Sequence, residues 1–142
     1  MDWLYLLNSF EGRIGRQTFW IAMGAVAVVN VLACYVAQEI AGDRLSAIID
    51  LAFTYPEFAI AAKRCRDRNL PLWLLAIFFV ANGLLDLLSV IGWAGTSDEP
   101  SMVSLVIALP FTVFGIALLV ELGFRRGTKG PNPYGPDPLM GK

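Results

Sequence analysis

The chain has 142 residues, of which 56% are hydrophobic and 16% are charged, and its mean hydropathy is +0.60. Soluble domains are about 45–50% apolar and about 25% charged, so this composition indicates an integral membrane protein. The net charge of −1 argues against nucleic-acid binding. Histidine is absent and the two cysteines lack a metal-ligand spacing, so we expect no metal, no cofactor and no histidine-based catalysis.

The first 16 residues are expected to form an interfacial segment ahead of the membrane spans. Its apolar side chains recur at helix-like intervals: Trp3, Leu4, Leu6, Leu7 and Phe10. An amphipathic stretch of this kind tends to lie along the head groups of a bilayer.

Four windows are predicted to cross the membrane, since a spanning helix needs roughly 20 mostly apolar residues. Three of them contain a single acid each: 17–40, 71–93 and 102–124. The remaining window, 45–62, contains both Asp50 and Glu57 and is the weakest by hydropathy.

The distribution of Lys and Arg supports all four spans, because these residues concentrate in cytoplasmic loops. Ten of the eleven basic residues precede the first span, join the second to the third, or follow the fourth; the exception is Arg44. We therefore predict an all-α integral membrane four-helix bundle, formed by one membrane domain over residues 1–142. Both termini are expected in the cytoplasm, the carboxyl end as a tail over 125–142.

An intramembrane polar cluster is predicted from Asp50, Glu57, Asn82 and Asp86. A rise of about 1.5 Å per residue puts Asp50 and Asp86 at similar depth. Helical spacing puts Asp50 and Glu57 on one face of the second span, and Asn82 and Asp86 on one stripe of the third. We expect the two stripes to face each other, because an acid exposed at the bilayer centre costs about 2.5–3.5 kcal/mol.

Two interpretations of these acids are open. One is a proton or cation relay, a frequent role of intramembrane carboxylates. The other is a polar clasp, in which the acids bind neighbouring groups and fix the helix register. Four short helices without an internal repeat leave little room for alternating access, which favours the clasp.

Three motifs lie at the predicted cytoplasmic positions: FEGRIGRQTFW (10–20), KRCRDRNLPLW (63–73) and GTKGPNPYGPDP (127–138). Together they resemble the family known as domain of unknown function 805, and the resemblance covers nearly the whole chain. It implies a small, multi-pass bacterial inner-membrane protein with four helices, and it implies no reaction. Cys65 and Arg66 stand where the family usually has leucine and histidine, so no role of that histidine transfers to this chain.

The motifs contain a cytoplasmic arginine and acid cluster: Arg13, Arg16, Arg64, Asp67 and Arg68. Arginine binds carboxylates and phosphates through two parallel hydrogen bonds. Asp67 is therefore a candidate to clamp Arg13 or Arg16 beneath the bundle. Alternatively, the four arginines form a pocket for an anionic lipid head group. The third possibility is that they only set the topology.

The tail motif is predicted to fold against the cytoplasmic face. Its glycines and prolines favour a stiff series of turns, in which Asn132, Tyr134 and Gly135 stand together and the two side chains can reach back to backbone or head groups. The segment lacks the GxxxxGK[ST] order of a phosphate loop, which argues against nucleotide hydrolysis.

The sequence therefore predicts a non-enzymatic assembly component, or one that contacts anionic phospholipid, acting as a homo-oligomer or within a larger membrane complex. A small proton- or cation-conducting protein that uses the intramembrane carboxylates is the alternative. A membrane enzyme acting on lipid is a third class, for which the only candidate groups are acids and the cysteines Cys34 and Cys65.

Overall fold

The computed structural model describes residues 2–96 and 99–140, in which the regular secondary structure consists of helices. Five helices follow one another: α1 (Trp3–Asn8), α2 (Arg16–Ala41), α3 (Asp43–Asp67), α4 (Trp73–Val90) and α5 (Met102–Gly123). Four of them, α2 to α5, are long and apolar enough to cross a membrane. The predicted all-helical class is confirmed, and each of the four predicted spans corresponds to a helix of sufficient length and apolarity.

Helix α3 continues five residues beyond the predicted end of its span at residue 62, because its basic end is buried rather than solvated. Lys63 and Arg64 are 0% and 1% exposed, and their charged groups donate to backbone carbonyls of other segments. Pro56 lies inside the helix without ending it. A hydropathy criterion therefore ends this helix too early, because it counts every charged residue as exposed to water.

Helix α1 has only six residues and packs on α3. Its first turn is capped by Asp2, whose carboxylate accepts a hydrogen bond from the Tyr5 amide at 3.1 Å. Leu6 is buried in the core, whereas Leu4 is 75% exposed. The segment therefore has one face on the protein and one face free.

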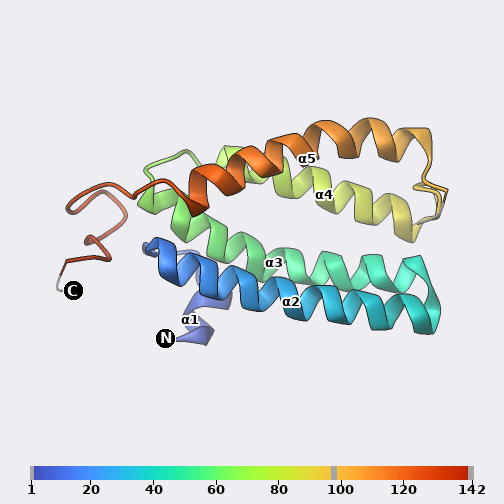
Figure 1. Cartoon of the computed structure of the whole chain (residues 1–142), viewed down its shortest axis with the longest axis horizontal. Helices are drawn as coiled ribbons and strands as arrows, with labels where there is room; N and C mark the ends of the chain where they lie inside the picture. Colours follow the sequence, from blue (N-terminus) through green and yellow to red (C-terminus); the bar gives the residue numbers. More distant parts are fainter. Residues whose placement is uncertain (1, 97–98, 141–142) are drawn as a thin grey trace.

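Helix α3 is the centre of the arrangement, since it packs against α1, α2 and α4. Helix α5 lies along α4, and both chain ends lie toward the end of the elongated molecule where α3 finishes (Figure 1). The most deeply buried apolar side chains also concentrate there, in an unbroken run of buried residues over 59–65 that faces Phe19, Leu75 and Leu122.

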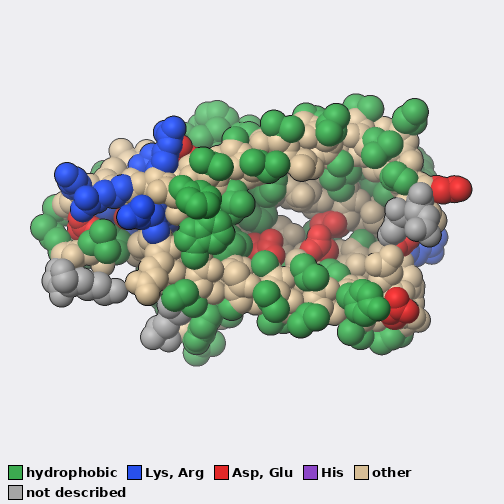
Figure 2. Space-filling model, viewed as in Figure 1, with side chains coloured by type: hydrophobic (Ala, Val, Ile, Leu, Met, Phe, Trp, Pro, Cys, Tyr) green, Lys and Arg blue, Asp and Glu red, His purple; other side chains and the backbone are tan. Residues whose placement is uncertain are grey.

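The outer faces of the long helices carry large exposed apolar side chains. Val31, Ile40 and Leu109 are 67%, 74% and 72% exposed. Figure 2 shows hydrophobic side chains spread along the whole length of one face and the Lys and Arg side chains gathered mainly at one end. An apolar surface of this extent is typical of lipid contact.

Candidate functional site

Asp67, at the last position of α3, is the hub of the cytoplasmic motif residues. One carboxylate oxygen accepts hydrogen bonds from Arg13 Nε at 3.1 Å and Nη2 at 2.9 Å. The other oxygen pairs with Arg64 Nη1. The side chains of Arg13 and Asp67 are 1% and 4% exposed, so this is a buried ion pair. The structure thus places Arg13 at Asp67, one of the two clamps considered from the sequence.

The remaining donors of Arg13 fasten the carboxyl-terminal tail. Nη1 donates to the carbonyls of Gly130 at 2.9 Å and Gly135 at 3.1 Å, and Nη2 donates to the Thr128 carbonyl at 2.8 Å. Gly135 has a φ of 136°, a conformation that favours glycine. One guanidinium group therefore joins the amino-terminal motif, the end of α3 and the tail.

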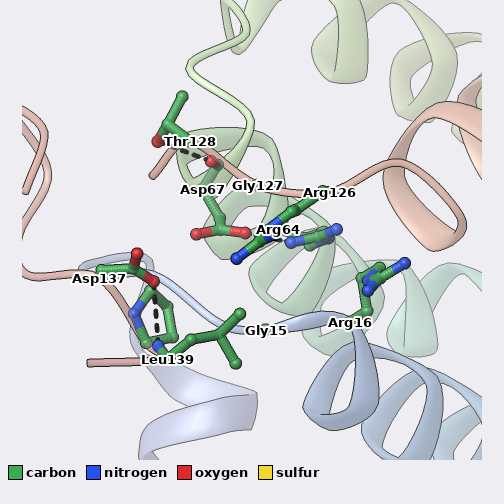
Figure 3. Close-up of a pocket in the computed structure, with 10 residues that line it drawn as sticks. Gly15, Arg16, Arg64, Asp67, Arg126, Gly127, Thr128, Asp137 and Leu139 are labelled. Carbon is green, nitrogen blue, oxygen red and sulfur yellow. Dashed lines mark hydrogen bonds and ion pairs between the residues drawn. The ribbon is translucent and has the colours of Figure 1, made fainter. Parts of the chain in front are cut away.

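A second set of contacts joins the tail directly to α3. The Thr128 amide and hydroxyl both donate to the Asp67 carbonyl, at 2.8 and 3.0 Å (Figure 3). Asn132 Nδ2 donates to the Arg66 carbonyl at 3.0 Å, and the Tyr134 ring lies 5.6 Å from the Arg66 guanidinium carbon. Asn132 thus turns toward the protein backbone.

Arg64 occupies the end of α5. Its Nε donates to the Leu122 carbonyl at 2.6 Å and its Nη2 to the Arg125 carbonyl at 2.5 Å. The last carbonyls of a helix have no partner within the helix, and a cation there also opposes the helix dipole. Arg64 therefore joins α3 and α5 while balancing its charge on Asp67.

Glu121, near the end of α5, pairs with two further arginines. It pairs with Arg125, four residues later in the chain, at 3.0 Å and with Arg68 Nη2 at 2.5 Å. The Arg68 contact between α5 and the end of α3 is one that sequence spacing does not reveal.

Arg16 lines the same small pocket as Arg64 and Asp67, but the ion pairs of Asp67 are with Arg13 and Arg64. Arg16 is exposed, and its Nη1 donates to the Phe124 carbonyl at 3.2 Å. The lipid pocket of four arginines is therefore not formed as expected, because Arg13 and Arg64 are buried and their donors are directed to the chain itself. Figure 3 shows Arg16 to one side, facing away from Asp67.

Lys63 is a structural cation that sequence reasoning missed. Its ammonium group donates to the carbonyls of Leu6 at 2.9 Å and Ser9, at the end of α1, and lies 5.0 Å from the Tyr5 ring centroid. Burial raises the pKa of the Tyr5 hydroxyl, which donates to the Glu11 carbonyl at 2.8 Å. Nothing in the sequence separates Lys63 from its basic neighbours.

Inside the apolar region, Asn30 of α2 joins two acids of α3. Its Nδ2 donates to Asp50 Oδ1 at 2.6 Å and, more weakly, to Glu57 Oε1 at 3.4 Å. Asp50, Glu57 and Asp86 are all partly buried, and none is classed as exposed. Asn30 was missed by the sequence analysis, although a lone amide in the middle of a predicted span was the available signal.

Asp50 and Asp86 line a cavity of about 310 Å³ together with Asn30, Cys34 and Ser89. It lies toward the α2–α3 connection, and Figure 2 shows acidic side chains within the hollow of the molecule. The expectation that Asp86 faces Asp50 therefore agrees with the geometry.

Asn82 does not join this cluster, contrary to the expected stripe. Its Nδ2 donates to the Phe78 carbonyl of its own helix at 2.8 Å, and it lines a separate cavity between α4 and α5. Because its amide is satisfied within α4, the energetic reason for turning it toward α3 does not apply.

The chain matches one protein family over most of its length. Residues 7–136 match the family model described as protein of unknown function (DUF805). The chain is 29% identical over 142 residues to the uncharacterized protein YiiR of Escherichia coli strain K12, with 96% of this chain and 88% of the relative covered. YiiR of Escherichia coli O157:H7 matches equally well, and no solved structure matches. The resemblance carried by the three motifs is confirmed: the chain belongs to the DUF805 family.

Proposed function

We propose that this protein is a non-enzymatic, multi-pass component of the bacterial inner membrane that assembles with itself or a larger complex and contacts anionic lipid. Its helices α2 to α5 form the bundle that crosses the membrane, its amino-terminal segment lies at the interface, and both termini face the cytoplasm. The motifs act as the cytoplasmic fastening of this bundle.

The observation that carries the proposal is that the charged motif residues bind other parts of the same chain. Arg13 and Arg64 direct their donors to Asp67 and to backbone carbonyls of the tail, α5 and the amino-terminal motif. A side chain that is saturated in this way holds segments together and is poorly placed to bind or transform a substrate. The motif residues are thus best explained by a structural role, in which they hold the segments of the chain together.

The charge distribution supports the orientation. The segments that gather around Asp67 carry most of the basic residues, whereas Arg44 lies in the first turn of α3, at the end of that helix opposite to Asp67. The positive-inside rule then assigns the Asp67 end to the cytoplasm. Exposed Leu4 and Trp3 on α1 are suited to the head-group region at that level.

Topology is tested by labelling with a membrane-impermeant maleimide. Lys129→Cys in the tail should react only after the inner membrane is opened, and Thr96→Cys in the α4–α5 connection should react in intact spheroplasts. Both positions are exposed, and the parent protein supplies the background from Cys34 and Cys65. The reverse pattern would overturn the orientation.

Assembly is tested by native mass spectrometry of the protein extracted in mild detergent. We expect a defined oligomer or a stable heteromeric complex that retains phosphatidylglycerol or cardiolipin. A bare monomer, without partner or retained anionic lipid, would contradict the proposal.

A second candidate function is proton or cation conduction, and the cavity beside Asp50 and Asp86 favours it. Glu57 is not among the described residues that line this cavity, and next to Glu57 the ring of Phe58 packs on that of Phe79 with centroids 5.2 Å apart. In liposomes, conduction predicts a proton flux that falls in Glu57→Gln. A flux equal to that of empty liposomes would remove this candidate.

A further inference from the structure

A groove of about 490 Å³ lies between the start of α2, the end of α5 and the carboxyl-terminal tail. Its polar side is formed by Arg16, Gln17 and Thr18, and its apolar side by Trp20, Phe124 and Leu139. Arg64 and Asp67 do not line it, although it shares Arg16 and Leu139 with the small pocket that they border. The groove is large enough for a small ligand.

The polar side favours an anion. Arg16 is exposed and makes one hydrogen bond within the described residues, to the Phe124 carbonyl, so most of its N–H groups remain available. Gly15 gives α2 no side-chain cap, which leaves the first amides and the positive end of the helix dipole beside the guanidinium.

No carboxylate lines the described part of the groove. The neighbouring acids Asp67 and Asp137 border a small adjoining pocket, which Arg16 also lines. Asp67 is already paired with Arg13 and Arg64. The two oxygens of Asp137 accept from the amides of Gly130 and Leu139, at 2.9 and 3.0 Å. The charge presented to a ligand in the groove is therefore that of Arg16.

The apolar side is held in a fixed shape. Trp20 Nε1 donates to the Gly123 carbonyl at 3.0 Å, and its ring packs edge to face on Phe124 with centroids 5.4 Å apart. A Cβ at Gly123 would lie 2.5 Å from the indole, so glycine at this position lets Trp20 cross the end of α5. The ring thus forms a wall that continues onto the apolar surfaces of α2 and α5.

The position of the groove identifies the occupant. It lies at the start of α2 and the end of α5, two helices long and apolar enough to cross a membrane. The orientation proposed above puts Arg16 at the level of the head groups and the Trp20 ring at the boundary with the hydrocarbon. A phospholipid matches both sides at once, whereas inorganic phosphate matches only the arginine.

We propose that this groove binds one anionic phospholipid, with its phosphate at Arg16 and the α2 amino terminus and its upper acyl chain against Trp20 and Phe124. The proposal rests on the lipid-contacting function above and assigns that function to Arg16 instead of the four-arginine pocket.

The test measures phospholipid adducts by native mass spectrometry after adding phosphatidylglycerol or phosphatidylcholine to delipidated protein. The native chain should prefer phosphatidylglycerol. In Arg16→Gln the preference for phosphatidylglycerol over phosphatidylcholine should fall about ten-fold, because a hydrogen bond to a charged group is removed. Arg16→Lys should retain most of this preference. Lys129→Gln, which removes an exposed tail charge outside the groove, is the matched control and should bind like the native chain.

A second readout locates the lipid. Phosphatidylglycerol brominated near the top of its acyl chain should quench the tryptophan fluorescence of the native chain more than that of Trp20→Phe. An unchanged preference in Arg16→Gln, or equal quenching in Trp20→Phe, would overturn the groove while leaving the lipid-contacting function intact. Equal binding of both lipids by the native chain would overturn both.

Discussion

Arg13 and Asp67, separated by 54 positions in the sequence, form a buried ion pair with an Nη2 to Oδ1 distance of 2.9 Å. The same carboxylate also pairs with Arg64, so one negative charge serves two buried guanidinium groups. Burying charges is costly unless they are paired and hydrogen-bonded. The carbonyls that surround both arginines complete that pairing, and in doing so they join three segments that are distant in sequence.

Replacing Asp67 should therefore destabilise the protein strongly. Asp67→Asn leaves two buried arginines without a counter-charge, and breaking a buried pair costs about 3–5 kcal/mol. We expect this loss in the free energy of unfolding, followed by circular dichroism as detergent-solubilised protein is titrated with dodecyl sulfate. Glu121→Gln is the matched control, since the Glu121 pairs are partly exposed and such pairs contribute about 1 kcal/mol or less. Equal losses in the two variants would refute the central position of Asp67.

Gly127 should tolerate no side chain. A Cβ at this position would meet the Asp67 carboxylate, with its Cγ only 2.5 Å away, and that carboxylate is fixed by Arg13 and Arg64. Gly127→Ala should reduce the free energy of unfolding by about 1–3 kcal/mol, the usual cost of overpacking. Gly24→Ala, where a Cβ meets nothing within 4 Å, should be neutral or slightly stabilising in the same titration. A neutral Gly127→Ala would show that the tail moves aside without loss.

The positions of three of the four long apolar helices were predictable, because they depend on composition within single segments. The windows 17–40, 71–93 and 102–124 each match one helix to within three residues at either end. The extension of α3 to Asp67 was not predictable in this way, because it depends on acceptors from other segments.

The sequence could predict which residue types form the candidate site, but not which residues pair with each other. The motifs made Asp67 one candidate to bind Arg13 or Arg16, beside a lipid pocket and a purely topological role. They could not choose among these, since the choice depends on carbonyls of the tail. Asn82 was misplaced because an amide can satisfy itself within its own helix. Lys63 was missed because its role is set by the path of α1.

Asn30 should matter more for stability than Asn82, although both amides lie in membrane helices. Asn30 bridges α2 and α3 through Asp50, whereas Asn82 donates within α4. Asn30→Leu should lower the free energy of unfolding by about 1–2 kcal/mol, the value of an interhelical hydrogen bond in model membranes. Asn82→Leu is the control and should change it by less. The two variants are compared by the same dodecyl sulfate titration, and the opposite ranking would contradict the polar clasp.

Asp137 should give the tail an acid-sensitive attachment. Hydrogen bonds from the amides of Leu139 and Gly130 hold the pKa of its carboxyl below the ordinary value of 3.8. The ionised form is therefore favoured in the folded tail, so its contribution is present above the unfolded pKa and is lost as the pH falls through the lower folded pKa. A ¹³C NMR titration of the carboxyl carbon in detergent micelles should give a midpoint below that of free aspartate. Over the same pH range, the amide signals of Gly130 and Leu139 should shift in the native protein and stay constant in Asp137→Asn. A midpoint at or above the ordinary value would mean that these amides do not hold the carboxylate in solution.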